Sequence, residues 1–248
     1  MKPRATDWSL ALTMAVAFGT GLWSFTAGRP EEWPIVALHG ISGLWLGLLL
    51  VPKLLRVRRR LWPRDRGAWL GLLATLLALA ALGTGVAWTA GGTFVALGYN
   101  LLNWHVVFGY ALTLLVSLHM LARAKPLRRA DLASRRQALR AALIVAGGAL
   151  LWPLKELLYD RLGAPGAARR FTGSRAWGDF TGNGFPVVSW VADRPRPLDP
   201  AAWRLRVEGL VARPLALGLA ELGGAAELEA TLDCTGGFHT TQRWGGRP

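Results

Sequence analysis

The segment LLNWHVVFGYALTLLVSLHMLA, which runs from Leu101 to Ala122, decides the fold that we expect for this chain. It contains no acidic residue, lysine or arginine, and its polar side chains include His105 and His119. A helix rises about 1.5 Å per residue, so a segment of this length crosses the roughly 30 Å of hydrocarbon in a bilayer. The sequence therefore predicts a transmembrane helix here.

Further apolar blocks of similar length predict a membrane protein. The chain has 248 residues, of which 52% are hydrophobic, and its mean hydropathy is +0.29. We expect an all-α transmembrane bundle of four to five spans, the other four being Trp8 to Ala27, Pro34 to Pro52, Ala68 to Ala90 and Ala141 to Leu154. The last span has a short apolar core between Arg140 and Lys155, so a buried or interfacial helix is the alternative there.

The positive charge of the chain predicts its orientation in the membrane. A net charge of +14 would suggest nucleic-acid binding in a soluble protein, but here Lys and Arg gather in residues 53–66 and 123–140, next to the predicted spans. We therefore expect no nucleic acid as a partner, a bacterial inner-membrane location with membrane lipid around the spans, and a cytoplasmic N-terminus. We interpret the first span as an uncleaved helix rather than a signal peptide. Five crossings from a cytoplasmic N-terminus then predict that the chain after Tyr159 lies outside, in the periplasm.

His39 and His105 are expected at the same depth in two different spans. Each lies about five residues, or roughly 7 Å of helical rise, below the predicted outer surface. Imidazole is costly in hydrocarbon without a partner, and haem iron is commonly held by histidines from facing helices. The sequence predicts b haem between His39 and His105; the alternatives are hydrogen bonding within the bundle and a proton relay, although a relay favours Asp or Glu within the spans. The nearby glycines would leave gaps for a flat macrocycle, although small residues also let membrane helices pack closely without a cofactor: Gly19, Gly21, Gly40, Gly43, Gly83, Gly85 and Gly109.

A second haem near the cytoplasmic side is a weaker possibility. His119 follows His105 by fourteen residues, which returns it near the same helix face, so we name it as a further candidate haem-binding residue. The matching position in the second span is Lys53, which reads better as a positive-inside residue, and His119 then reads as an interfacial polar residue. Met14 and Met120 are conceivable ligands, but a single Met on an apolar helix is usually a packing residue.

After Tyr159 the composition changes, which predicts two domains, residues 1–158 and 159–248. The second is expected to be a mixed α/β, mainly β, soluble unit, with strands at Trp203–Val207 and Glu229–Leu232, and with an extended piece followed by a short helix between Pro214 and Leu222. The sequence shows no internal repeat or low-complexity tract, and its single cysteine, Cys234, excludes an intrachain disulfide and a CxxC metal site. Because two glycines follow it, a bulky group can approach; a buried, unreactive thiol is the alternative.

Five short motifs in this second part resemble the sulfite-oxidase-type molybdopterin oxidoreductase domain. They are Phe171-Thr-Gly-Ser174, Phe185-Pro-Val-Val-Ser-Trp190, Trp203-Arg-Leu-Arg-Val-Glu-Gly209, Arg213-Pro-Leu215, and Leu232-Asp-Cys-Thr-Gly-Gly-Phe238 with Trp244-Gly following. The histidine-bearing half similarly resembles cytochrome b561-like membrane anchors. The resemblance implies a molybdopterin centre whose molybdenum is ligated by the catalytic Cys234, a b haem, exchange of electrons with quinone, and a small-molecule redox substrate.

The chain departs from the family pattern in two places. Phe238 and His239 stand where the family commonly has Trp or Tyr, which leaves the substrate open; His239 either touches substrate or is an exposed loop residue. The family's domain also continues well beyond this loop, so we expect only its N-terminal part here. The alternative functions are a non-catalytic haem electron carrier or membrane anchor, and a proton-coupled transporter.

Overall fold

The computed structural model describes residues 2–58, 66–186, 196–224 and 226–246. The chain divides into two compact units, residues 1–175 and 176–248. Each unit is described by itself. The boundary lies beyond the predicted one at residue 158, because the loop that follows the last long helix belongs to the helical unit.

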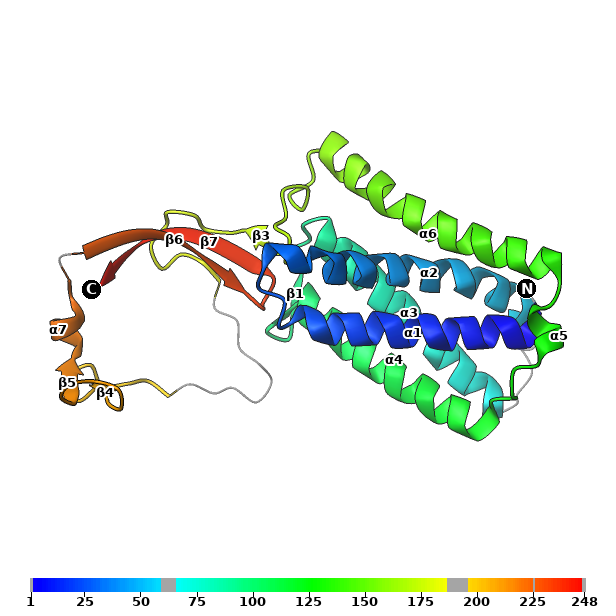
Figure 1. Cartoon of the computed structure of the whole chain (residues 1–248), viewed down its shortest axis with the longest axis horizontal. Helices are drawn as coiled ribbons and strands as arrows, with labels where there is room; N and C mark the ends of the chain where they lie inside the picture. Colours follow the sequence, from blue (N-terminus) through cyan, green and yellow to red (C-terminus); the bar gives the residue numbers. More distant parts are fainter. Residues whose placement is uncertain (1, 59–65, 187–195, 225, 247–248) are drawn as a thin grey trace. The chain divides into compact units, whose positions relative to one another are not determined.

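The first unit is a bundle of long helices (Figure 1). Its elements are α1 (Pro3–Ser24), the short 3-10 helix η1 (Pro30–Glu32), α2 (Trp33–Val57), α3 (Arg66–Thr89), β1 (Val95–Ala96), β2 (Tyr99–Asn100), α4 (Leu101–Arg123), α5 (Arg129–Leu132) and α6 (Arg135–Arg161). The helices α1 and α2 form one antiparallel hairpin and α3 and α4 a second, while α6 packs along α2.

Four helices in the described part of the chain are long and apolar enough to cross a membrane. They are Pro30–Val57, Trp69–Thr89, Leu101–Leu121 and Arg135–Arg161. The weakest predicted span thus lies within a helix of 27 residues. The first predicted span also forms a helix, α1, but α1 is not among these four.

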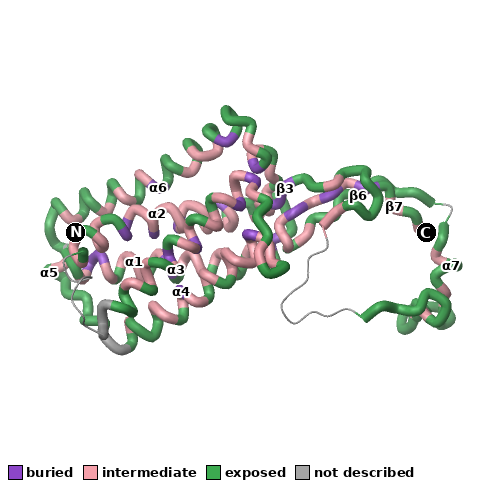
Figure 2. Tube along the Cα trace, turned by 180° about the vertical axis from the view of Figure 1, so that it is seen from behind, coloured by how far each residue is buried: buried purple, intermediate pink, exposed green. Residues whose placement is uncertain are grey.

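The centre of the bundle is apolar. It is formed by buried side chains from four helices: Met14, Leu46, Leu50, Ala78 and Leu112. Figure 2 marks the buried positions along the chain in purple. Large apolar side chains cover the outside as well, including Leu12, Leu114 and Leu143, each more than 60% exposed. An apolar exterior around an apolar interior is the arrangement expected of helices surrounded by lipid.

The helices α2 and α6 interlock through two tryptophan–glycine pairs. The ring of Trp152 on α6 occupies the place where a Cβ on Gly40 would stand, and the ring of Trp45 on α2 occupies the same place at Gly148. Trp45 also donates from Nε1 to the carbonyl oxygen of Val145, at 2.9 Å. Each helix therefore contributes one tryptophan and one glycine to the contact, and these two pairs define how α6 packs along α2.

A capping box starts α4 a short distance before His105. The side chain of Asn100 accepts from the backbone N–H of Asn103, and the side chain of Asn103 accepts from the backbone N–H of Asn100. This reciprocal pair satisfies two donors that a helix start otherwise leaves unpaired. The position of the helix start, and with it the height of His105, is thereby defined.

The second unit contains small antiparallel sheets and one short helix. Its elements are β3 (Arg175–Ala176), which begins at the boundary, β4 (Arg204–Val207), β5 (Leu215–Gly218), α7 (Leu219–Leu222), β6 (Ala226–Cys234) and β7 (Phe238–Gly246). One sheet has the order β3-β7-β6 and the other pairs β4 with β5. The strands expected at 203–207 and 229–232 and the extended piece followed by a helix between 214 and 222 are confirmed.

Candidate functional site

The structure brings His39 of α2 and His105 of α4 together. Their ring centroids are 5.7 Å apart and the ring planes are nearly perpendicular, at 88°. Each histidine comes from a different helical hairpin. The sequence predicted that these two residues lie at the same depth, and in the structure their rings are neighbours.

The Nδ1 atom of each imidazole is held by the main chain of the neighbouring helix. His39 Nδ1 lies 2.8 Å from the carbonyl oxygen of Ala17 on α1, and His105 Nδ1 lies 2.8 Å from that of Ala81 on α3. A carbonyl oxygen can only accept, so Nδ1 carries the proton and donates it. The neutral ring then has an unprotonated Nε2, and no hydrogen bond to either Nε2 occurs among the described residues.

Two glycines make this approach to the main chain possible. A Cβ on Gly21 would lie 3.0 Å from Cε1 of His39, and a Cβ on Gly85 would lie 3.0 Å from Cε1 of His105. Such a distance is too short for ordinary packing, so a larger residue at either position displaces the ring. Glycine at these positions lets each imidazole lie against the helix backbone.

The two halves of the site repeat one another. Gly19-Thr20-Gly21 on α1 corresponds to Gly83-Thr84-Gly85 on α3, 64 positions later in the chain. Ala17 and Ala81 have the same offset, and the hydrogen-bond distances of the two histidines agree. Sequence analysis found no repeat, although these two Gly-Thr-Gly triplets were its visible signal.

The separation of the two rings fits a metal ion shared by both. At the metal–nitrogen distance of about 2.0–2.1 Å that imidazole makes with first-row metals, two coaxial rings have centroids about 6.3 Å apart. The observed 5.7 Å differs from that value by roughly 0.6 Å. Neutral imidazoles with Nδ1–H donated to a carbonyl and Nε2 free for a metal are the usual form of ligating histidine.

The glycines near the histidines divide into two groups. We expected them to leave gaps for a flat macrocycle, but the space at Gly40 is filled by Trp152, and the imidazoles themselves use the space at Gly21 and Gly85. At Gly19, Gly83 and Gly109, in contrast, no other described side chain or backbone atom lies within 4 Å of the place of a Cβ, apart from the local helix. Gly19 and Gly83 are exposed on the outside of the bundle, so of these three positions only Gly109, one turn from His105, offers open space near the histidine pair.

The residues considered for a second, inner haem lie apart from this arrangement. His119 is exposed, and the Lys53 ammonium pairs with Asp7 of α1 at 2.6 Å. Met14 is buried in the apolar centre of the bundle. The described structure thus gives Lys53 and Met14 other partners and places His119 on the outside of α4.

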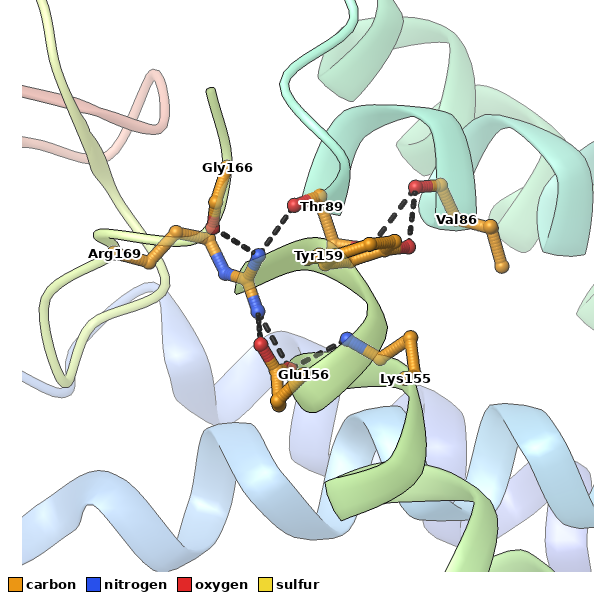
Figure 3. Close-up of polar contacts among 7 residues, drawn as sticks. All are labelled: Val86, Thr89, Lys155, Glu156, Tyr159, Gly166 and Arg169. Atoms are coloured by element: carbon orange, nitrogen blue, oxygen red, sulfur yellow. Dashed lines mark hydrogen bonds and ion pairs between the residues drawn. The ribbon is translucent and has the colours of Figure 1, made fainter. Parts of the chain in front are cut away.

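A polar network joins the end of α6 to the end of α3 (Figure 3). Arg169 donates from Nη2 to both carboxylate oxygens of Glu156, at 2.6 and 2.7 Å, and from Nη1 to the carbonyls of Thr89 and Gly166. Glu156 also pairs with Lys155, and Tyr159 donates to the carbonyl of Val86 at 3.1 Å. These bonds satisfy carbonyl groups at the C-terminus of α3, one turn from Gly85.

Arg175 closes the same end of the first unit. Its guanidinium lies over the ring of buried Trp88, 4.5 Å from the centroid, and donates to the carbonyl oxygen of Gly92 at 3.1 Å. Burial lowers the pKa of Arg175. Together with Arg169, it anchors the loop after α6 to the end of α3.

Cys234 lies at the tight turn between β6 and β7. It faces Phe238 in the register, and Gly237 donates to its carbonyl oxygen at 2.9 Å with a φ of +85°, a conformation that favours glycine. The backbone N–H of Gly236 donates to Sγ at 3.3 Å. The cysteine is free and only partly buried.

The loop 177–185 lies against β7, the strand that follows the turn at Cys234. The stacked rings of Phe185 and Phe238 and the hydrogen bonds of Gln242 and Thr240 to Gly178 hold this loop against β7. His239 faces Asp233 across the hairpin. Most of the predicted motif from Phe185 to Trp190 lies outside the described residues. Among the residues that the structure describes, no group of three or more His, Cys, Asp or Glu side chains is placed to hold a metal ion.

Comparison with known proteins gave no match: no family model, curated protein or solved structure matches the chain. The functional assignment therefore rests on the geometry of the two histidines and on the turn at Cys234.

Proposed function

We propose that the first unit is a membrane-embedded electron-transfer protein that holds one b haem between His39 and His105. The observation that carries the proposal is the close approach of two imidazoles from separate hairpins, each with its Nδ1–H donated to a carbonyl oxygen. This arrangement fixes the tautomer that leaves both Nε2 atoms available to iron. Haem, when bound, supplies a one-electron couple.

The residues of the chain orient the ligands and exclude water. Ala17 and Ala81 set the direction of the two rings, while Gly21 and Gly85 allow the close approach. Apolar packing around Met14 closes one side of the site against solvent. Low polarity and fixed imidazole orientation are the means by which a protein sets the potential of such a group.

The same geometry weighs against the proton-relay alternative. A relay needs ionisable partners along its path, and two acidic side chains of the long helices are already engaged: Asp7 with Lys53, and Glu156 with Lys155 and Arg169. Asp160, the third acidic residue of the described long helices, is exposed at the end of α6. Both Nδ1 protons are also committed to carbonyl oxygens. Axial ligation therefore accounts for the two histidines better than proton transfer does.

For the second unit we propose that Cys234 is the thiolate ligand of a molybdenum–pterin centre that exchanges electrons with the haem and, through it, with quinone. The specific observation is the hydrogen bond from the Gly236 N–H to the sulfur in an accessible glycine turn. A soft thiolate suits a redox metal. A haem carrier or anchor without catalytic activity is the second candidate, favoured by the small sheets of this unit and its exposed Leu228 and Leu232.

A spectroscopic experiment tests the haem proposal. The full chain is produced with haem precursor, purified in detergent, and measured as a reduced-minus-oxidised spectrum and as a pyridine haemochrome. We expect one b haem per chain with a low-spin, six-coordinate spectrum. A preparation that remains without haem after reconstitution, although it is folded, overturns the proposal.

The transporter and carrier alternatives give different results in the same preparation. Metal analysis distinguishes a molybdenum enzyme from a haem carrier, because the carrier contains iron without molybdenum. Substrate uptake by vesicles that contain haem-free protein would identify a transporter.

A further inference from the structure

Two threonines repeat on the helices that face the histidines. Thr20 on α1 lies one turn above Ala17, and Thr84 on α3 lies one turn above Ala81. The hydroxyl of Thr20 is 2.6 Å from the carbonyl of Val16 and 3.1 Å from that of Ala17. The hydroxyl of Thr84 has the same distances to the carbonyls of Ala80 and Ala81.

Each threonine hydroxyl shares its one proton between two carbonyls. The shorter contact is to Val16 or Ala80, and the longer one, at 3.1 Å, is to Ala17 or Ala81, which therefore accept from two side chains. Ala17 accepts from Nδ1 of His39 at 2.8 Å and from Thr20, and Ala81 accepts from Nδ1 of His105 at 2.8 Å and from Thr84. A hydroxyl that bonds back to its own helix is common for Thr in membrane helices. What is specific here is that, in both hairpins, the same carbonyl also orients an imidazole.

A second donor makes a carbonyl oxygen a weaker acceptor for the first. Two donors on one oxygen draw on the same electron density, so the effect is opposite in sign to the strengthening along a chain of hydrogen bonds. With Thr present, the carbonyl draws less on the Nδ1 proton, and the imidazole keeps less negative charge. Less charge on an axial ligand favours ferrous over ferric iron, which raises the reduction potential.

We propose that Thr20 and Thr84 are positioning residues that raise the reduction potential of the haem through the Ala17 and Ala81 carbonyls that orient His39 and His105. The inference rests on the proposed haem function. Because the distances are equal in the two hairpins, both histidines would receive the same adjustment. Neither threonine has a direct role as a ligand.

The test is an anaerobic redox titration of the purified, haem-loaded full chain, followed at the visible bands of the reduced haem. Replacing Thr20 or Thr84 by Val removes the hydroxyl and keeps the shape of the side chain. We expect the ratio of reduced to oxidised haem at a fixed potential to fall about twofold for each change and about fourfold for both. Fourfold corresponds to about 35 mV for a one-electron couple.

Matched variants separate this effect from a general change in helix packing. Thr75→Val removes a hydroxyl on α3 that bonds to the carbonyl of Gly71, at 2.8 Å, and should leave the potential unchanged. Thr20→Ser and Thr84→Ser keep the hydroxyl and should retain the wild-type potential. If a Val variant does not bind haem, the comparison of Ser with Ala at the same position replaces it.

Each outcome has a definite meaning. Val variants with wild-type potential, or Ser variants that shift as far as the Val variants do, overturn the inference while the haem proposal stands. A wild-type chain without haem overturns the haem proposal itself. An unchanged low-spin spectrum in the Val variants shows that any shift arises with both axial histidines in place.

Discussion

At the scale of single residues, His39 and His105 should be indispensable for haem binding and His119 should not. Replacing either of the paired histidines by Ala removes one axial ligand of the proposed centre, so we expect haem content to fall at least tenfold. His119→Ala serves as the matched control, because His119 is exposed on α4, away from the pair. Pyridine haemochrome per mole of protein measures the effect, and an equal loss in all three variants contradicts the assignment.

The two glycines against the imidazoles offer a finer test. Gly85→Ala places a Cβ 3.0 Å from Cε1 of His105 and should displace the ring from the Ala81 carbonyl. We expect a loss of haem affinity of about 10- to 100-fold, as for other changes to groups that orient a metal ligand. Gly83→Ala, two residues away in open space, is the control and should bind haem as the wild type does. Equal affinities of the two variants in haem titrations would show that the close approach has no role.

Cys234→Ser tests the thiolate proposal in the second unit. Serine keeps the size of the side chain but removes the soft sulfur ligand, so we expect molybdenum content to fall several-fold in metal analysis, with haem content unchanged. The hydrogen bonds that form the turn come largely from the backbone of Cys234 and Gly237 and should remain. Molybdenum that is retained in the variant, or absent from the wild type, refutes the role of Cys234.

At the scale of elements, the tryptophan–glycine pairs between α2 and α6 should control how α6 attaches. Gly40→Val forces a side chain into the space of the Trp152 ring, and overpacking of this kind typically costs about 1–3 kcal/mol. We expect a lower midpoint of thermal unfolding in detergent. Gly71→Ala, in open space on α3, should leave the midpoint close to that of the wild type. Trp152→Ala in the Gly40→Val background should restore part of the loss, and a failure to do so would exclude the steric explanation.

The helices and strands could largely be predicted from the sequence, but the packing contacts between them could not. Apolar blocks located every long helix, and alternation with glycine turns located β4, β5 and β6, because both signals are local in the sequence. That Gly40 receives Trp152 depends on how two distant helices pack, which no local pattern records. The pairing of His39 with His105 could be predicted because, in a membrane span, the number of residues from the end of the helix gives the depth of a side chain in the bilayer.

The repeated halves were missed for a related reason. The helices α1 and α3 share the Gly-Thr-Gly triplet but few of the residues around it, so the similarity is too short to stand out in the sequence. The similarity becomes clear in the structure, because in both helices the last glycine of the triplet contacts a histidine ring in the same way. The expectation that Gly40 leaves space for a cofactor failed because the residue that fills the space comes from α6, more than 100 positions away.

At the scale of the whole molecule, the single cysteine reports on orientation. Five crossings would place Cys234 on the periplasmic side, and α1 counts as the first of them if it lies in the bilayer alongside its partner α2. In cells that make no molybdenum cofactor, where the thiol would carry no metal, we expect a membrane-impermeant maleimide to label Cys234, and Cys234→Ser to abolish the labelling. A cysteine introduced at Arg129, in the connection before α6, should be labelled only after the membrane is opened; the reverse pattern would invert the topology.

The division of the histidine site between two similar hairpins has a consequence for how the chain can be assembled. Each hairpin contributes one imidazole, one glycine and one hydroxyl, and the covalent connection between α2 and α3 contributes none of these groups. Two separately encoded pieces, residues 1–57 and 66–248, contain complete complementary halves and should find each other in the bilayer. Co-production of the pieces is then expected to restore the haem spectrum that neither piece gives alone.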